Sequence, residues 1–181
     1  MRTALAAGVR FFQYRSKNGP RKDIYNASLQ LAGIARGAGA LFIVNDHADI
    51  AAATGADGVH LGQDDLPIAE ARKVLGEGKI VGLSTHSREQ ALAAEAAGAD
   101  YIGFGPIFAT STKDAGVAQG VERIRDIKQA VRVPVIAIGG INRDTVRAVM
   151  SAGADGVAVI SAVLSAPDPS RAAAELIGLI T

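Results

Sequence analysis

The segment Gly98-Ala99-Asp100-Tyr101-Ile102-Gly103-Phe104 is one of three similar stretches that determine the expected fold. The other two run from Gly55 to Leu61 and from Gly153 to Val159, and all three share the order Gly-Ala-Asp followed by a short apolar run. Each stretch follows an Ala-rich segment. A Gly at this place can end a helix, and a short apolar run is typical of a buried strand. The repeat therefore predicts three helix-to-strand junctions.

Four further apolar runs bring the number of expected strands to seven. Ala7 to Phe12 is a weaker copy of the repeat, and the remaining runs are Ala40 to Val44, Lys79 to Leu83 and Pro134 to Ile138. Strands that alternate with helices favour parallel βα units, in which each strand is buried on both faces.

The segments between the strands carry helical signals. Ser87 to Gln90 has the form of a capping box, and Asn142 is expected to be the N-cap of a helix through Val146 and Met150. Apolar residues also recur at helical spacing at Val121, Ile124, Ile127 and Val131. These signals support the alternation of strands with helices.

Two architectures of parallel βα units compete. A doubly wound sheet usually has a Gly-x-Gly-x-x-Gly turn after its first strand, and this sequence has none. We therefore expect an α/β fold of the (β/α)8 TIM-barrel class, in a single domain over residues 1–181. Met1 falls in the helix before the first visible strand, so we expect the first βα unit to be lacking and the barrel to be open beside the run from Val9 to Tyr14.

Composition limits the classes of partner. The chain has 181 residues, 49% of them hydrophobic, and a formal net charge of +1, which argues against nucleic acid or an anionic membrane as partners. It contains no Cys, no long apolar run and no signal-peptide pattern at its start, so we expect a cytoplasmic protein acting on small molecules. A homo-oligomer stays an open alternative.

Polar residues follow every expected strand. The functional groups of a barrel of this type lie on the loops at the carboxyl ends of the strands. The residues in these places are Gln13, Arg15, Lys17, Asn45, Asp46, Gln63, Asp64, Asp65, Ser84, Thr85, His86, Thr110, Thr112, Lys113, Gly139, Gly140, Ile160 and Ser161.

The charged members of this set suggest a diphosphate site. Arg15, Lys17 and Lys113 could neutralise a diphosphate, while Asp46 and Asp65 could hold a Mg²⁺ that bridges its oxygens. Such a site suggests loss of pyrophosphate. The alternatives are helix capping for the two Asp residues and a solvated loop for the cations.

The last two strands suggest a second anion site. Gly139-Gly140 and Ile160-Ser161 follow the expected strands seven and eight of a full barrel, where backbone N–H groups commonly hold a phosphate. The hydroxyls and the ammonium of the loop from Gly105 to Lys113 also suit phosphate oxygens. The alternatives are a tight turn for the Gly pair and an ordinary surface loop.

The three histidines show no zinc-like spacing. His60 lies inside an apolar run, and we interpret it as a core residue with satisfied hydrogen bonds. His86 lies near the expected site, where acid-base chemistry and a role at the start of a helix remain alternatives.

Five motifs together resemble the thiamine-phosphate synthase family over the chain from about Ala4 to the last helix. They are Gln13-Tyr14-Arg15-Ser16-Lys17, Asn45-Asp46, Gly58 to Asp65, Gly105 to Lys113, and Ile138-Gly139-Gly140-Ile141. The resemblance implies a (β/α)8 barrel that joins 4-amino-5-hydroxymethyl-2-methylpyrimidine diphosphate to 4-methyl-5-(2-phosphoethyl)thiazole. The implied products are thiamine phosphate and pyrophosphate, and the implied cofactor is Mg²⁺.

The resemblance also implies roles for individual residues. The pyrimidine diphosphate would be bound by Gln13, Tyr14, Arg15, Ser16, Lys17, Asn45, Ser84 and Lys113. The thiazole phosphate would be bound by Thr110, Ser111, Thr112, Gly140, Ile160 and Ser161. Asp46 and Asp65 would bind Mg²⁺, and Arg15, Lys17, Ser84 and Lys113 would assist the departure of diphosphate in a dissociative mechanism.

Two features depart from the family, and two other functions stay open. The family has a βα unit before the position of Met1, and an acidic residue is common where this chain has Ser16. The first alternative function is a thiazole tautomerase, an isomerase on the same barrel that uses a His in the loop after Ser84. The second is a binder of thiazole phosphate or thiamine phosphate without turnover.

Overall fold

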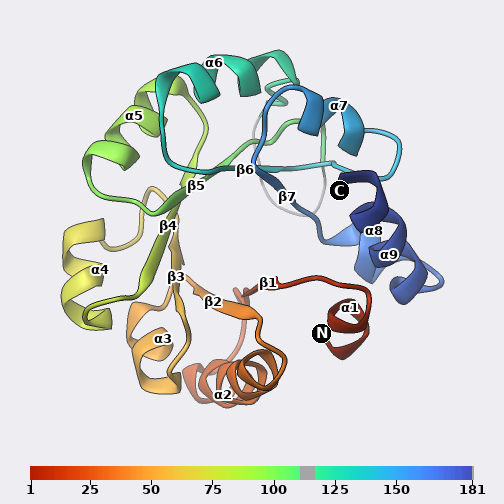
Figure 1. Cartoon of the computed structure of the whole chain (residues 1–181). Coiled ribbons are helices and arrows are strands. Elements are labelled where there is room, and N and C mark those ends of the chain that lie inside the picture. The colour runs from red at the N-terminus through yellow and green to blue at the C-terminus, as the bar shows by residue number, and fades with distance from the viewer. Residues whose placement is uncertain (111–116, 181) are drawn as a thin grey trace.

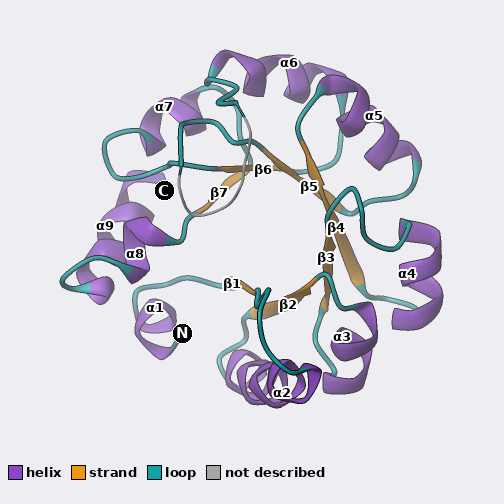
Figure 2. Ribbon diagram, turned by 180° about the vertical axis from the view of Figure 1, so that it is seen from behind, coloured by secondary structure: helices purple, strands orange, loops and turns teal. Residues whose placement is uncertain are grey.

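The strands form one parallel sheet that curls into most of a barrel. The computed structural model of the chain describes residues 1–110 and 117–180. Within these residues, seven parallel strands pair in sequence order, and the sheet curls with its helices on the outside (Figures 1 and 2). The strands are β1 (Phe11–Tyr14), β2 (Leu41–Asn45), β3 (Gly58–Leu61), β4 (Ile80–Thr85), β5 (Tyr101–Phe104), β6 (Val135–Ile138) and β7 (Gly156–Ala158).

The helices cover the outer face of the sheet, and the two ends of the helical layer meet. Helix α1 packs against α9, although β1 and β7 are the two edges of the sheet (Figure 1). The helices are α1 (Arg2–Ala6), α2 (Arg21–Gly37), α3 (Ala48–Thr54), α4 (Ile68–Leu75), α5 (Arg88–Ala96), α6 (Glu122–Ala130), α7 (Val146–Ser151), α8 (Ser161–Leu164) and α9 (Pro169–Ile180). Throughout residues 1–110 and 117–180, every helix is too short or too polar to cross a membrane.

Alternate residues of the strands point to opposite faces of the sheet, either outward to the core beneath the helices or inward. Phe42 and Val44 of β2 are buried in the main hydrophobic core, which fills the space between the sheet and the helices. The residues between them face the inside of the curled sheet, as the side-chain period of two requires. There Phe11 meets Tyr101 ring edge to face, with centroids 5.5 Å apart.

Glycines make room for the few large side chains on the inner face. A Cβ atom at Gly82 would lie 2.2 Å from the Tyr101 ring, and one at Gly103 would lie 3.2 Å from Cε1 of His60. The positions opposite these large side chains must therefore carry no side chain. Gly58 is required for another reason, since a Cβ atom there would lie 1.9 Å from the backbone carbonyl oxygen of Ile80. This explains why Gly interrupts strands that are otherwise built from β-branched and aromatic residues.

The Asp of each Gly-Ala-Asp repeat binds the backbone of the preceding strand. Its carboxylate accepts a hydrogen bond of 2.7 Å from a backbone N–H near the start of that strand. Its own N–H donates to the carbonyl of the same residue, at 2.8 to 2.9 Å. The Asp residues are Asp57, Asp100 and Asp155, and their partners, in the same order, are Phe42, Val81 and Val135. Three pairs of strands, β2 with β3, β4 with β5 and β6 with β7, are thus fixed in register.

The structure confirms most of the fold expected from the sequence. The seven strands, the parallel order and the sheet edges at the first and last strands agree with a barrel that lacks one βα unit in the described residues. Ser87 caps α5 by accepting a hydrogen bond from the Gln90 N–H at 3.2 Å. The Gln90 side chain accepts from the His86 N–H at 2.8 Å, one residue earlier than a capping box requires.

One expected cap lies before the start of its helix. Helix α7 begins at Val146 with Thr145 at the N-cap, and the Thr145 side chain does not cap it. The Asn142 side chain accepts hydrogen bonds from the N–H groups of Asp144 and Thr145, at 2.9 and 3.3 Å. These are the bonds that an N-cap side chain makes, but Asn142 makes them to the turn that leads into α7 and not to the helix itself.

The Asp155 carboxylate gives a testable dependence of stability on pH. Burial alone would raise the pKa of Asp155, but the hydrogen bonds from Lys128 and Val135 outweigh it and hold the pKa below its ordinary value. A lowered pKa contributes stability above the pKa of the unfolded chain, and this stability is lost as the pH falls through the folded pKa. We expect Asp155→Asn to lower the free energy of unfolding at pH 7 by about 1 kcal/mol.

Urea unfolding at pH 7 and at pH 3 checks this expectation, because the difference from the wild type should shrink at pH 3. Asp144→Asn is the matched control, since the Asp144 side chain is 85% exposed. An equal destabilisation at both pH values would contradict a role for the charge of Asp155.

Candidate active site

The polar residues expected at the site lie at the carboxyl ends of the strands. Gln13 and Tyr14 end β1, Asn45 ends β2, and Ser84 is the fifth residue of β4. The strands are parallel, so these ends meet at one rim of the barrel. The loops at this rim carry Arg15, Ser16, Lys17, Asp46, Asp65, Thr110 and Gly140, and Ile160 and Ser161 lie at the start of α8.

Asp46 and Asp65 come together across two neighbouring loops, where their carboxyl groups share a hydrogen bond. Asp46 has a φ of 66°, which is unusual for a residue other than Gly. Its N–H donates to the His60 carbonyl at 2.8 Å, and its side chain accepts from the Asn45 amide. The Gly62 N–H donates to Asp65 Oδ2 at 2.6 Å. The backbone thus holds two carboxyl groups against each other.

The charge of this pair is poorly compensated. Burial raises the pKa of Asp46 above its ordinary value, and the negative charge of Asp65 and the hydrogen bond between the two groups raise it further. The positive charge of Arg15 has the opposite, smaller effect on this pKa. When both are ionised, the neighbouring carboxyl groups of Asp46 and Asp65 repel each other, and a cation between them would remove this repulsion.

Helix capping does not explain the two carboxylates. Helix α3 has His47 at its N-cap and α4 has Pro67, and neither helix has a side-chain cap. Mg²⁺ in enzymes of phosphate chemistry is commonly held by one or two carboxylates and completed by substrate phosphate and water. Asp46 and Asp65 fit this pattern. Within the described ranges, no group of three or more His, Asp or Glu residues suits a metal ion held by protein alone.

Residues of β1 divide between the two faces of the sheet. Gln13 makes a side-chain hydrogen bond with Tyr101 on the inner face. Tyr14 packs against the hydrophobic core on the outer face, so it does not share a face with Gln13. In the loop that follows, the Ser16 hydroxyl donates to the Asn18 carbonyl at 3.3 Å. Arg15 is close enough to act on the charge of Asp46.

Ser84 is held by its backbone and by its side chain. The Gln63 side-chain amide donates to the Ser84 carbonyl at 2.6 Å. The Ser84 hydroxyl lies 2.9 Å from Nε2 of His60, whose Nδ1 lies 2.9 Å from the Tyr101 hydroxyl. His60 is 7% exposed, which confirms its interpretation as a core residue with satisfied hydrogen bonds. The sequence did not reveal which residues satisfy it, because its partners lie on other strands.

The loops after β5 and β6 are packed against each other. The Phe108 N–H donates to the Gly139 carbonyl at 3.0 Å. A Cβ atom at Gly140 would lie 2.7 Å from the Ala109 carbonyl oxygen, and Gly140 has a φ of 64°, so only Gly fits without strain. His86 Nδ1 lies 2.5 Å from the Gly105 carbonyl oxygen. The loop that precedes Thr110 is therefore fixed next to the Gly pair.

Three predicted residues, Ser111, Thr112 and Lys113, lie outside the described residues. Ile160 and Ser161 are in the predicted place after β7, where Ile160 is the N-cap of the four-residue helix α8. The roles of these residues in binding remain predictions.

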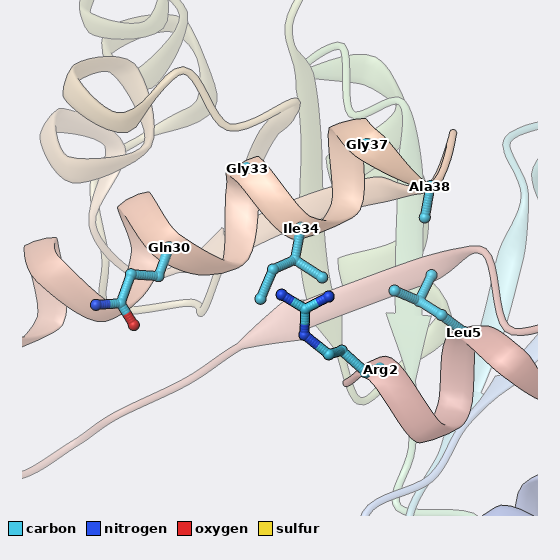
Figure 3. A pocket seen from close by; sticks show the side chains of 7 residues that line it. All are labelled: Arg2, Leu5, Gln30, Gly33, Ile34, Gly37 and Ala38. Atoms are coloured by element: carbon cyan, nitrogen blue, oxygen red, sulfur yellow. The ribbon is translucent and has the colours of Figure 1, made fainter.

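Two hollows lie on the surface, one away from this rim and one that reaches it. One, of about 750 Å³, lies between α1 and α2, where Arg2 and Leu5 extend toward Ile34 (Figure 3). It reaches Gly37 and Ala38, just before β2, so it lies at the opposite end of the sheet. The other, of about 290 Å³, lies between α4 and α5, where Gln63 and Asp65 of the rim line it together with apolar side chains such as Leu66.

The fold and the rim define a class of protein, a parallel α/β barrel with cationic side chains and a pair of carboxyl groups at the carboxyl ends of its strands. Comparison with known proteins narrows this class. The family model of thiamine monophosphate synthase matches residues 1–163. The chain belongs to this family, whose curated relatives are enzymes of the transferase class.

Individual relatives agree with this assignment. The thiamine-phosphate synthase of Methanosarcina barkeri is 48% identical over 181 residues, which cover 99% of this chain and 82% of the relative. That of Moorella thermoacetica is 48% identical over 182 residues, covering 100% of this chain and 87% of the relative. The solved structure of thiamine phosphate pyrophosphorylase from Pyrococcus furiosus has a TM-score of 0.92 at 43% identity, covering 99% of this chain and 86% of that one.

The repulsion between Asp46 and Asp65 can be tested without turnover. A raised folded pKa means that ionisation of Asp46 costs stability as the pH rises through that pKa, and the cost is present at neutral pH. We expect Asp46→Asn to raise the melting temperature of the metal-free protein at pH 7.5. Mg²⁺ should raise the melting temperature of the wild type and have little effect on the variant.

Thermal unfolding followed by circular dichroism, with Mg²⁺ and with EDTA, measures both effects. Asp64→Asn is the matched control because Asp64 is an exposed neighbour of Asp65. A Mg²⁺-induced shift that persists unchanged in Asp46→Asn would contradict the metal assignment.

Proposed function

We propose that this thiamine-phosphate synthase couples 4-amino-5-hydroxymethyl-2-methylpyrimidine diphosphate with 4-methyl-5-(2-phosphoethyl)thiazole, and that it requires Mg²⁺. The observation that carries the proposal is the paired carboxylates Asp46 and Asp65 beside Arg15 at the barrel rim. Membership in the family and the identity of the relatives support the reaction. The Gly pair packed against the loop after β5 supports a separate site for the thiazole phosphate.

The proposed reaction begins with the departure of diphosphate. The bond between the pyrimidine methylene carbon and the diphosphate oxygen breaks, and both electrons leave with the oxygen. Arg15, Lys17 and Lys113 stabilise the negative charge that grows on the leaving group, and Ser84 donates a hydrogen bond to it. When bound at Asp46 and Asp65, Mg²⁺ supplies further neutralisation of that charge.

The second step joins the two substrates. The thiazole nitrogen gives its electron pair to the pyrimidine methylene cation, and the new carbon–nitrogen bond completes thiamine phosphate. Residues near Thr110, Gly140 and Ser161 would hold the thiazole phosphate so that its nitrogen faces the cation. Orientation of this kind is worth a large part of a bimolecular barrier. The mechanism requires no nucleophile from the protein.

The tautomerase alternative has less support. A tautomerase has no diphosphate to bind, so it gives no reason to bury Asp46 against Asp65. Nδ1 of His86, the residue that kept this alternative open, lies close to the Gly105 carbonyl oxygen.

Action on small molecules and a cytoplasmic location stay predictions.

Release of pyrophosphate by the purified chain tests the proposal. We expect release only when both substrates and Mg²⁺ are present, and none in EDTA. Isomerisation of a thiazole carboxylate phosphate without metal would favour the tautomerase. A rise in melting temperature with thiazole phosphate, without release of pyrophosphate from folded protein, would favour the non-catalytic binder.

Lys113 offers a more specific test of the leaving-group role. A cation that acts on charge developing in the transition state contributes to kcat more than to binding. We expect Lys113→Ala to lower kcat by about 100-fold or more, with a smaller effect on the KM for thiazole phosphate. Steady-state kinetics with each substrate varied in turn measures both constants. A defect confined to the KM for thiazole phosphate would contradict this role.

A further inference from the structure

A chain of hydrogen bonds on the inner face of the barrel ends at the active site. It runs from Gln13 on β1 to Tyr101 on β5, then to His60 on β3 and finally to Ser84 on β4. Both ring nitrogens of His60 are engaged, each at 2.9 Å. Its members come from four strands, so only the curvature of the sheet brings them together.

The strands leave space for this arrangement. A Cβ atom at Gly103 would lie 3.2 Å from Cε1 of His60, and one at Gly82 would lie 2.2 Å from Cζ of Tyr101. Side chains at these two positions would displace both rings. The rings themselves are tilted by 34° with centroids 5.4 Å apart, so they support each other. The position of His60 is therefore fixed by packing as well as by hydrogen bonds.

The direction of these hydrogen bonds depends on the buried phenol of Tyr101. Burial raises the pKa of Tyr101, so its hydroxyl keeps its proton at neutral pH and can donate it. The Gln13 hydrogen bond has the opposite, smaller effect on this pKa. A Tyr101 hydroxyl that donates to His60 Nδ1 leaves the ring proton on Nε2, which faces Ser84 Oγ.

We propose that His60 is a positioning residue that, in its Nε2-protonated form, donates to Ser84 Oγ and so directs the Ser84 hydroxyl proton toward an oxygen of the bound diphosphate. The inference rests on the proposed function, in which Ser84 binds that group. Without this donation the hydroxyl could turn its proton to the imidazole and present a lone pair to an anion. His60 thus makes Ser84 a donor, and the Gln63 amide at the Ser84 carbonyl holds the strand in place.

The tautomer can be measured in the wild-type protein without substrates. The chain has three histidines, so ¹⁵N spectra of protein labelled in the imidazole rings are simple, and His60→Gln identifies the signal of His60. We expect His60 to carry its proton on Nε2. A proton on Nδ1 would overturn the proposal, whatever the activity of the protein.

Kinetics of two variants separate positioning from packing. His60→Gln keeps an amide donor near the place of Nε2, whereas His60→Leu has none. We expect His60→Leu to lower kcat by about ten- to 100-fold, as for loss of one hydrogen bond to a charged group, with little change in the KM for thiazole phosphate. His60→Gln should recover most of this loss. Equal losses in both variants would overturn the proposal.

A double variant tests whether His60 acts through Ser84. We expect His60→Leu combined with Ser84→Ala to be no slower than Ser84→Ala alone, because the interaction has already been removed. Losses that multiply would show that His60 acts by another route and would overturn the proposal. Thr85→Val is the matched control, since Thr85 is a fully buried neighbour whose hydroxyl donates to the Gly103 carbonyl at 3.2 Å. It should keep wild-type kcat.

Failure of the two proposals can be told apart. If folded wild-type protein releases no pyrophosphate, the proposed function fails, and the tautomer of His60 still decides whether Ser84 is held as a donor. If the wild type is active and the losses from His60→Leu and Ser84→Ala multiply, the function stands and the positioning role fails.

Discussion

The structure depends on the bond between the Asp of each Gly-Ala-Asp repeat and the backbone of the strand before it. Parallel strands have no tight turn to fix their register, because a helix intervenes between each pair. The carboxylates of Asp57, Asp100 and Asp155 fix three pairs at their amino ends. A slip of one residue would exchange the inner and outer faces of a strand. The register that these bonds set is what places Asn45 and Ser84 at the rim.

The inner face shows how packing and chemistry share the same residues. A full barrel fills its interior with layers of large side chains, whereas this sheet sets Tyr101 over Gly82 and His60 close to Gly103. The result is a layer that is both packed and polar. Its hydrogen bonds connect Gln13 to Ser84, two residues of the proposed pyrimidine diphosphate site. The support of the site is therefore part of the interior that holds the sheet together.

Much of the candidate site could be predicted from the sequence because every polar residue in question follows an apolar run. Once the strands are taken as parallel, Asp46 and Asp65 must lie at one rim, and the structure brings them into contact. The partners of His60 could not be predicted, since Tyr101 and Ser84 are distant in the chain. The cap assigned to Asn142 falls on the turn before α7, because the sequence does not show at which residue the regular helix begins.

The sequence by itself determined the class of fold, the number of strands and the rim at which the polar residues of the candidate site lie. It did so because burial on both faces of parallel strands leaves a repeated pattern of short apolar runs. Only the tertiary structure decided which Asp carboxylates hold strands and which face each other at the site. It also decided that His60 engages Ser84. The physical reason is that hydrogen-bond partners across a barrel are fixed by the curvature and register of the whole sheet, which no local stretch of sequence encodes.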